Sequence, residues 1–226
     1  ADLAVGDSEL NTAELRAAGA PRARPLPILF DRARLQERRG APSGSGPLVL
    51  VVSRLVPNKR HDLAIAAFAA WRGARSPQAR LLLVGEAISP SYLALIERIA
   101  EQSGAGAAIT FAGGLPQPEL NAAYAAADVV LSTSEHEGFS VPLLEAFHFG
   151  VPVVARPAGA MPEVGGDAVL WDEGEDPAVT AELIELAVHD GELRAELERR
   201  GRARLERFSY ERTAAEIVGA VEEALA

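Results

Sequence analysis

Six short apolar segments recur along the chain, and this spacing most constrains its fold. They are residues 47–53, 80–86, 107–113, 128–134, 151–157 and 167–171. The first, PLVLVVS, is an unbroken apolar run rich in β-branched residues, which is typical of a strand buried on both faces. Helical patterns separate the first five segments. We therefore predict an α/β fold, a Rossmann-like, doubly wound parallel sheet of about six strands with helices on both faces.

The helices between these segments have recognisable ends. The expected helices are residues 62–72, 90–102, 118–127 and 140–149. Gly150 follows the last of them and is a predicted C-cap, because glycine adopts the left-handed conformation readily. From Pro177 onward the chain reads as helical, and Gly191, Gly201 and the segment FSYER are expected to divide it into three helices.

The first 46 residues do not follow the strand–helix alternation. Residues 1–20 contain one short strand and one capped helix, and residues 41–46 (APSGSG) have the composition of a flexible hinge. We interpret residues 1–46 as the remnant of an N-terminal domain plus a linker. Residues 47–226 are then one Rossmann-like domain.

Composition excludes several classes of site. The absence of cysteine removes disulfides, zinc–thiolate sites and cysteine nucleophiles. A net charge of −10 argues against broad nucleic-acid binding. No apolar run is long enough to span a membrane and the start is unlike a signal peptide, so we predict a cytoplasmic location. Asp-x-Asp is absent, and the acidic run 172–176 lacks the spacing of a calcium loop, so no metal is expected.

Cationic and glycine-containing loops follow the first and fourth predicted strands. Arg54 and Lys59 follow the first strand, and Gly138 precedes a helix for which Ser140 is the predicted N-cap. Carboxyl ends of parallel strands meet at one edge of a sheet, where ligands bind. Two cations and the N-terminus of a helix at that edge predict a diphosphate site.

Two glutamates flank this predicted diphosphate site. Glu145 lies five residues past the cap, about 7 Å along the helix, where a carboxylate can accept both hydroxyls of a ribose. Glu137 lies before the helix and could accept hydroxyls of a sugar on the second phosphate. Each has a simpler interpretation, Glu137 as a solvated loop residue and Glu145 as an exposed or first-turn residue favoured by the helix dipole. His136 is read either as a surface residue or as a ligand contact.

Three motifs together resemble one enzyme family. They are EGFSVPLLEA at 137–146, an E-x7-E pattern; SRLVPNK at 53–59; and FSYER at 208–212. The chain resembles the C-terminal, donor-binding domain of the large retaining GT-B glycosyltransferases, the glycogen-synthase-like or group 1 family. The resemblance covers about residues 46–226, and it implies that residues 47–226 are a nucleotide-sugar-binding domain. It implies that the C-terminal helices, about 209–226, cross back toward the N-terminal domain.

The resemblance also implies roles for particular residues. Arg54 and Lys59 would bind the donor diphosphate, Glu137 would be the catalytic residue that contacts the donor sugar, and Glu145 would bind the ribose.

Further residues would approach the donor from the backbone. Gly138, Phe139 and Ser140 would lie against the sugar and phosphates. Gly113 and Leu115, after the third strand, would lie near the base.

The function implied is retaining transfer from a nucleoside-diphosphate sugar, without a metal cofactor. The acceptor, a sugar, lipid or small molecule, would be held by the N-terminal domain, so this chain alone is expected to turn over poorly. Peripheral membrane association of a longer protein is compatible with this interpretation. The alternatives are a non-catalytic nucleotide-sugar-binding module, a sugar-nucleotide epimerase of similar fold, and a glycoside hydrolase that uses Glu137 and Glu145 as its acid and nucleophile.

Overall fold

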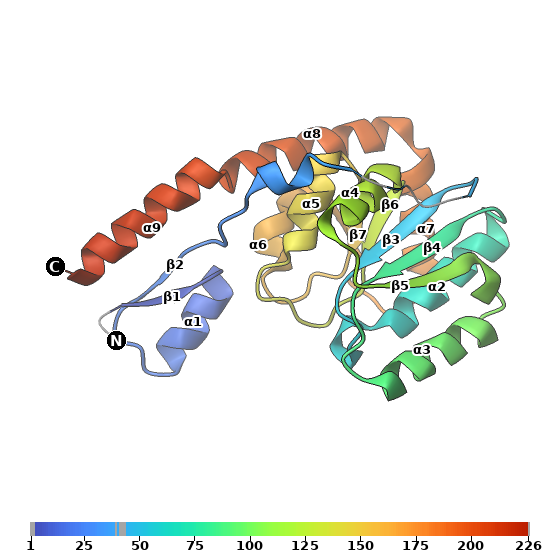
Figure 1. Cartoon of the computed structure of the whole chain (residues 1–226), viewed down its shortest axis with the longest axis horizontal. Helices are drawn as coiled ribbons and strands as arrows, with labels where there is room; N and C mark the ends of the chain where they lie inside the picture. The colour runs from blue at the N-terminus through green and yellow to red at the C-terminus, as the bar shows by residue number, and fades with distance from the viewer. Residues whose placement is uncertain (1–2, 39, 41–43, 226) are drawn as a thin grey trace.

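Six parallel strands form the central sheet in the computed structural model, which describes residues 3–38, 40 and 44–225 (Figure 1). The strands are β3 (Leu48–Val52), β4 (Arg80–Val84), β5 (Ile109–Gly113), β6 (Val129–Ser132), β7 (Val153–Ala155) and β8 (Val169–Trp171). Their order across the sheet is β5-β4-β3-β6-β7-β8, and every neighbouring pair is parallel. The predicted α/β fold is confirmed.

Helices cover both faces of this sheet, because alternate strand residues point to opposite sides. On one face, Val49 and Val51 share a core with α2 (His61–Ala74), α3 (Pro90–Gln102) and α7 (Pro177–His189). On the other face, Leu48 and Leu50 share a core with α4 (Gln117–Ala126), α5 (Val141–Phe149) and α8 (Gly191–Arg207). The apolar runs of the sequence are therefore strands buried from both sides.

The helix ends agree with the sequence except at one glycine. The predicted C-cap, Gly150, is left-handed with φ 68°. The C-terminal region forms three helices, the third being α9 (Tyr210–Leu225). Gly201, however, does not divide helices as predicted. It lies inside α8 and faces Phe147 of α5, where an added Cβ would come within 2.9 Å of the ring. Its role is close helix packing.

The N-terminal residues form a small unit of their own. Strands β1 (Ala4–Gly6) and β2 (Ala23–Pro25) pair in parallel and are joined by α1 (Glu9–Ala17). Helix α9 extends from the sheet domain to this unit (Figure 1). There, Glu223 accepts hydrogen bonds from Arg22 and Arg24 at 2.8 and 3.2 Å.

The segment between β2 and the sheet packs closely on the sheet domain. Phe30 and Leu35 are 2% and 0% exposed and belong to its core. Asn121 of α4 donates hydrogen bonds to the carbonyls of Arg34 and Glu37 at 2.9 and 2.7 Å. The predicted linker thus contributes core side chains. Residues 41–43 of the predicted hinge lie outside the described residues.

Candidate functional site

The loop after β3 carries Arg54 and Lys59 and is held from several directions. The Leu55 amide donates to the Glu86 carbonyl, and the Glu135 amide donates to the Asn58 carbonyl, both at 2.9 Å. The Thr133 hydroxyl, after β6, donates to the carbonyls of Lys59 and Arg60 at 3.0 and 2.8 Å. The carboxyl ends of β3, β4 and β6 are therefore joined into one rigid edge.

Two non-glycine residues of the described chain have left-handed backbones, and both lie at this edge. They are Arg60, with φ 49°, and Ser140, with φ 73°. Such conformations are concentrated at functional sites, because surrounding contacts must hold them. Ser140 stands at the N-cap position of α5 but its side chain makes no capping hydrogen bond. The predicted capping by its hydroxyl is wrong, because capping side chains require an extended backbone at that position.

Lys59 and Glu137 meet in an ion pair. The Lys59 ammonium lies 2.6 Å from Glu137 Oε1, and the Ser134 hydroxyl donates to the same oxygen at 2.8 Å. The two charged side chains are only 12% and 18% exposed. The structure thus brings together the residue predicted to bind phosphate and the residue predicted to bind the sugar.

Arg54 offers a second cation at the same edge. Its side chain is exposed and makes no hydrogen bond or ion pair with the described residues. Exposed His136 likewise has no such partner. An arginine without a carboxylate partner loses little when it binds an anion, because no existing ion pair must break.

Glu145 is buried, contrary to the interpretation as an exposed helix residue. Its side chain is 6% exposed. Oε1 accepts from Arg34 Nη2 at 2.7 Å, and Oε2 accepts from the Tyr124 hydroxyl at 2.9 Å. Burial raises the pKa of Glu145 above its ordinary value, while the Tyr124 hydrogen bond and the Arg34 charge act in the opposite direction. Each carboxylate oxygen has two lone pairs, so capacity for ribose hydroxyls remains.

The remaining predicted residues are placed as follows. Gly138 faces the N-terminal unit, where an added Cβ would lie 3.0 Å from Asn11 Nδ2. Phe139 is 4% exposed and packs edge-to-face on Phe208, with ring centroids 5.4 Å apart. Gly113 is the last residue of β5, two strands from β3, and Leu115 lies two residues beyond it. Among the described residues, no hydrogen bond or ion pair joins this last pair to the Lys59–Glu137 pair.

Three partners of the two glutamates were not predicted from the sequence. Ser134 carries no signal beyond its position after a strand. Tyr124 is a lone aromatic residue in an alanine-rich helix, which indicates packing but not a carboxylate contact. Arg34 lies in the segment read as a linker, and its pairing with Glu145 depends on tertiary folding across 111 residues of sequence.

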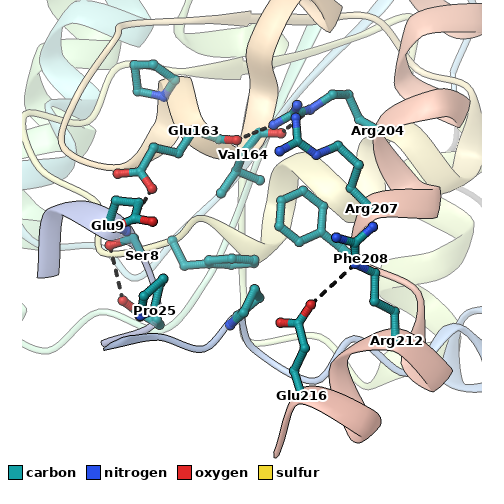
Figure 2. Close-up of a pocket in the computed structure, with 14 residues that line it drawn as sticks. Ser8, Glu9, Pro25, Glu163, Val164, Arg204, Arg207, Phe208, Arg212 and Glu216 are labelled. Carbon is teal, nitrogen blue, oxygen red and sulfur yellow. Dashed lines mark hydrogen bonds and ion pairs between the residues drawn. The ribbon is translucent and has the colours of Figure 1, made fainter. Parts of the chain in front are cut away.

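A cavity of about 550 Å³ separates the N-terminal unit from α6 (Met161–Gly165), α8 and α9 (Figure 2). It is lined by apolar rings and by several arginines. Across its edge, the Glu163 carboxylate accepts hydrogen bonds from the amides of Glu9 and Leu10 at 2.8 and 3.0 Å. A carboxylate of the sheet domain therefore binds the N-terminal turn of α1, as the helix dipole favours.

A buried histidine underlies the cationic loop. His61, at the start of α2, is 0% exposed and lies 2.9 Å from the Ser53 hydroxyl and 3.2 Å from the Tyr92 hydroxyl. Burial lowers the pKa of His61 to about 4.

Protonation of His61 should destabilise the fold in mild acid. The pKa of His61 is lower in the folded chain than in the unfolded chain, so the neutral, buried imidazole favours the folded state. This contribution to the free energy of unfolding is fully present above pH 6.5 and is lost as the pH falls toward 4. Between pH 7 and pH 5 we expect the free energy of unfolding to fall by about 2 kcal/mol from this group. Urea unfolding of wild type and His61→Gln at both pH values measures this change in the free energy of unfolding. Equal losses in the two proteins would contradict the assignment.

The sequence of this chain is similar to those of known glycosyltransferases. Residues 33–204 match the family model described as glycosyl transferases group 1, which covers most of the chain. The chain belongs to this glycosyltransferase family. A D-inositol 3-phosphate glycosyltransferase of Salinispora arenicola is 32% identical over 231 residues, 97% of this chain and 51% of the relative. A GDP-mannose-dependent alpha-(1-6)-phosphatidylinositol monomannoside mannosyltransferase of Mycolicibacterium smegmatis is 35% identical over 165 residues, 69% of this chain and 42% of the relative.

Known structures share the fold of this family member. Anabaena HepE in complex with UDP and glucose superimposes with a TM-score of 0.83 at 22% identity, over 98% of this chain and 63% of that one. Sucrose-phosphate synthase from Thermosynechococcus elongatus gives 0.83 at 24% identity, over 100% and 59%. The chain spans about half the length of the curated relatives it matches. None of the helices among the described residues combines the length and apolarity that crossing a bilayer requires.

Proposed function

We propose that this glycosyltransferase chain binds the nucleoside-diphosphate sugar from which the sugar is transferred, with retention of configuration, to an acceptor. The observation that carries the proposal is the pairing of Lys59 with Glu137 at the carboxyl edge of the sheet, where Arg54 also lies and has no partner among the described residues. The names of the relatives support it, since one is GDP-mannose-dependent, and HepE is seen with UDP and glucose.

The chemistry follows from the charges at this edge. Arg54, Lys59 and the first-turn amides of α5 stabilise the negative charge that develops on the departing diphosphate, without a metal. When phosphate draws Lys59 away, Glu137 is released to accept hydroxyls of the donor sugar. Glu145 accepts the ribose hydroxyls through its remaining lone pairs. Gly113 and Leu115 border the base.

The acceptor is held elsewhere in this proposal, by a part of a longer protein that faces the same edge. Closure of that part over the donor would exclude water from the reacting sugar. The sheet domain by itself then binds donor but transfers the sugar slowly.

A glycoside hydrolase that uses the two glutamates is disfavoured by the cations at this edge. Hydrolysis of a plain glycoside has no use for Arg54 and Lys59, whereas a departing diphosphate is stabilised by them. Non-catalytic binding remains the competing proposal, and it requires the same donor site.

Calorimetric titration with UDP, GDP and ADP tests the donor site. We expect one nucleotide to bind, and Arg54→Met to weaken it by about 10-fold or more, since a hydrogen bond to a charged group contributes roughly 1.5–3 kcal/mol. Arg98→Met, an exposed arginine of α3 outside the site, is the matched control and should bind as wild type.

Absence of binding by all three nucleotides at millimolar concentration would refute the donor site. Equal nucleotide affinity of wild type and Arg54→Met would show that Arg54 does not bind the nucleotide. Transfer to an acceptor by the longer protein separates an enzyme from a binding module.

A further inference from the structure

Glu145 holds its position through two partners of different origin. Tyr124 belongs to α4, which is part of the sheet domain. Arg34 belongs to the 3-10 helix η1 (Arg32–Leu35), in the segment that precedes the sheet. The ion pair therefore joins the predicted ribose ligand to a part of the chain outside the strand–helix repeat.

The backbone around Arg34 is fixed independently of its side chain. Leu35 is fully buried in the core, and Asn121 binds the Arg34 carbonyl. The Arg34 side chain is 39% exposed. Removing the guanidinium should therefore leave the segment docked. The effect of that removal on Glu145 can then be measured in a folded protein.

We propose, on the basis of the donor site above, that Arg34 is a positioning residue that holds Glu145 charged and oriented for the ribose hydroxyls of the donor nucleotide. Burial by itself favours the neutral carboxylic acid, which is a weaker acceptor and turns one oxygen into a donor. A cation 2.7 Å from Oε1 opposes this, as does the hydroxyl donated to Oε2.

Other charged groups on the elements packed against α5 point elsewhere. Among the described residues, only Tyr124 and Arg34 act on the ionisation of Glu145. Arg32 of η1 pairs with Glu206, and Glu163 of α6 binds the first turn of α1. Glu119, in the first turn of α4, is exposed. In α8, Glu198 lies at Gly150 and Arg204 donates to the Val164 carbonyl. His148 of α5 itself packs on Phe149, and Arg38 lies over the Phe149 ring.

The first test follows the carboxyl group directly. The Glu145 signal in a ¹³C-glutamate-labelled protein, assigned by its loss in Glu145→Gln, is titrated in wild type, Arg34→Met and Arg34→Lys. We expect the pKa of Glu145 to rise in Arg34→Met and to return toward the wild-type value in Arg34→Lys. Arg32→Met, which removes a neighbouring half-buried arginine of the same helix that pairs with Glu206, should leave it unchanged. This readout needs no nucleotide, so it judges Arg34 even if the proposed donor site fails.

The second test measures nucleotide affinity against pH. With the nucleotide that wild type binds, Arg34→Met should bind about tenfold more weakly at pH 7 and recover part of the loss at pH 8.5, where the carboxylate re-forms. An unchanged Glu145 titration in Arg34→Met would overturn the proposal. So would a gain in affinity, which would make Arg34 a competitor for the ribose, or a loss that does not vary with pH. Failure of wild type to bind any nucleotide refutes the donor site, and with it the nucleotide half of the proposal.

Discussion

Replacing Gly85 with alanine should lower the free energy of unfolding by about 2–5 kcal/mol, through backbone strain and overpacking together. Gly85 ends β4 with φ 148°, and an added Cβ would lie 1.8 Å from the Ser53 carbonyl oxygen. Relief requires the backbone at Ser53 to move. Because Arg54 follows directly, the affinity for nucleotide should fall as well. Urea unfolding and nucleotide titration measure the two effects.

Gly73→Ala is the matched control for this substitution. Gly73 lies within α2, has no positive φ, and has no atom within 4 Å of an added Cβ. Alanine is the better helix former, so this variant should be unchanged or more stable by up to about 1 kcal/mol. A Gly85→Ala protein as stable as Gly73→Ala would show that the close approach to Ser53 does not exist.

Lys59→Met should weaken nucleotide binding by about 100-fold or more. The variant loses a charge-assisted bond to the diphosphate, which contributes roughly 1.5–3 kcal/mol. It also leaves Glu137, now paired only with Ser134, to repel the bound anion. The loss should therefore exceed that of Arg54→Met, whose side chain has no carboxylate partner in the described chain. Calorimetric titration of both variants with the same nucleotide makes the comparison.

A double-mutant cycle with Glu137→Gln identifies the source of this loss. The single variant Glu137→Gln should bind the free nucleoside diphosphate as well as or better than wild type, because Lys59 no longer needs to leave an ion pair. The double variant should bind more tightly than Lys59→Met alone. If the two substitutions are additive instead, the observed ion pair has no part in nucleotide binding.

Sequence patterns predicted the sheet and its helices because their physical causes are local. Uninterrupted runs such as 47–53 reflect burial on both faces, and Gly150 ends α5 because only a few residues tolerate its left-handed backbone. The same local reasoning failed at Gly201. A glycine that permits helices α5 and α8 to approach has the same appearance in sequence as one that ends a helix.

The candidate site was predictable in position but not in its internal contacts. Strand ends define one edge of a parallel sheet, so Lys59 and Glu137 could be expected near one another. The burial of Glu145 could not be expected from the sequence. It depends on the segment around Arg34, which is distant in sequence and folds against α4 and α5. Ser140 shows a related limit, since its residue type favours capping while its backbone is held in a conformation that prevents it.

The contact between Glu163 and the first turn of α1 bears on how firmly the N-terminal unit is held. Two amide hydrogens and one carboxylate are all groups that water solvates well, so parting them exchanges one set of hydrogen bonds for another. Such a contact contributes on the order of 1 kcal/mol. The bonds of Glu223 to Arg22 and Arg24 form a second polar link to the same unit, and neither link belongs to the two cores of the sheet domain. Water can therefore compete for the links that hold the N-terminal unit, whereas it does not reach the apolar packing of the sheet.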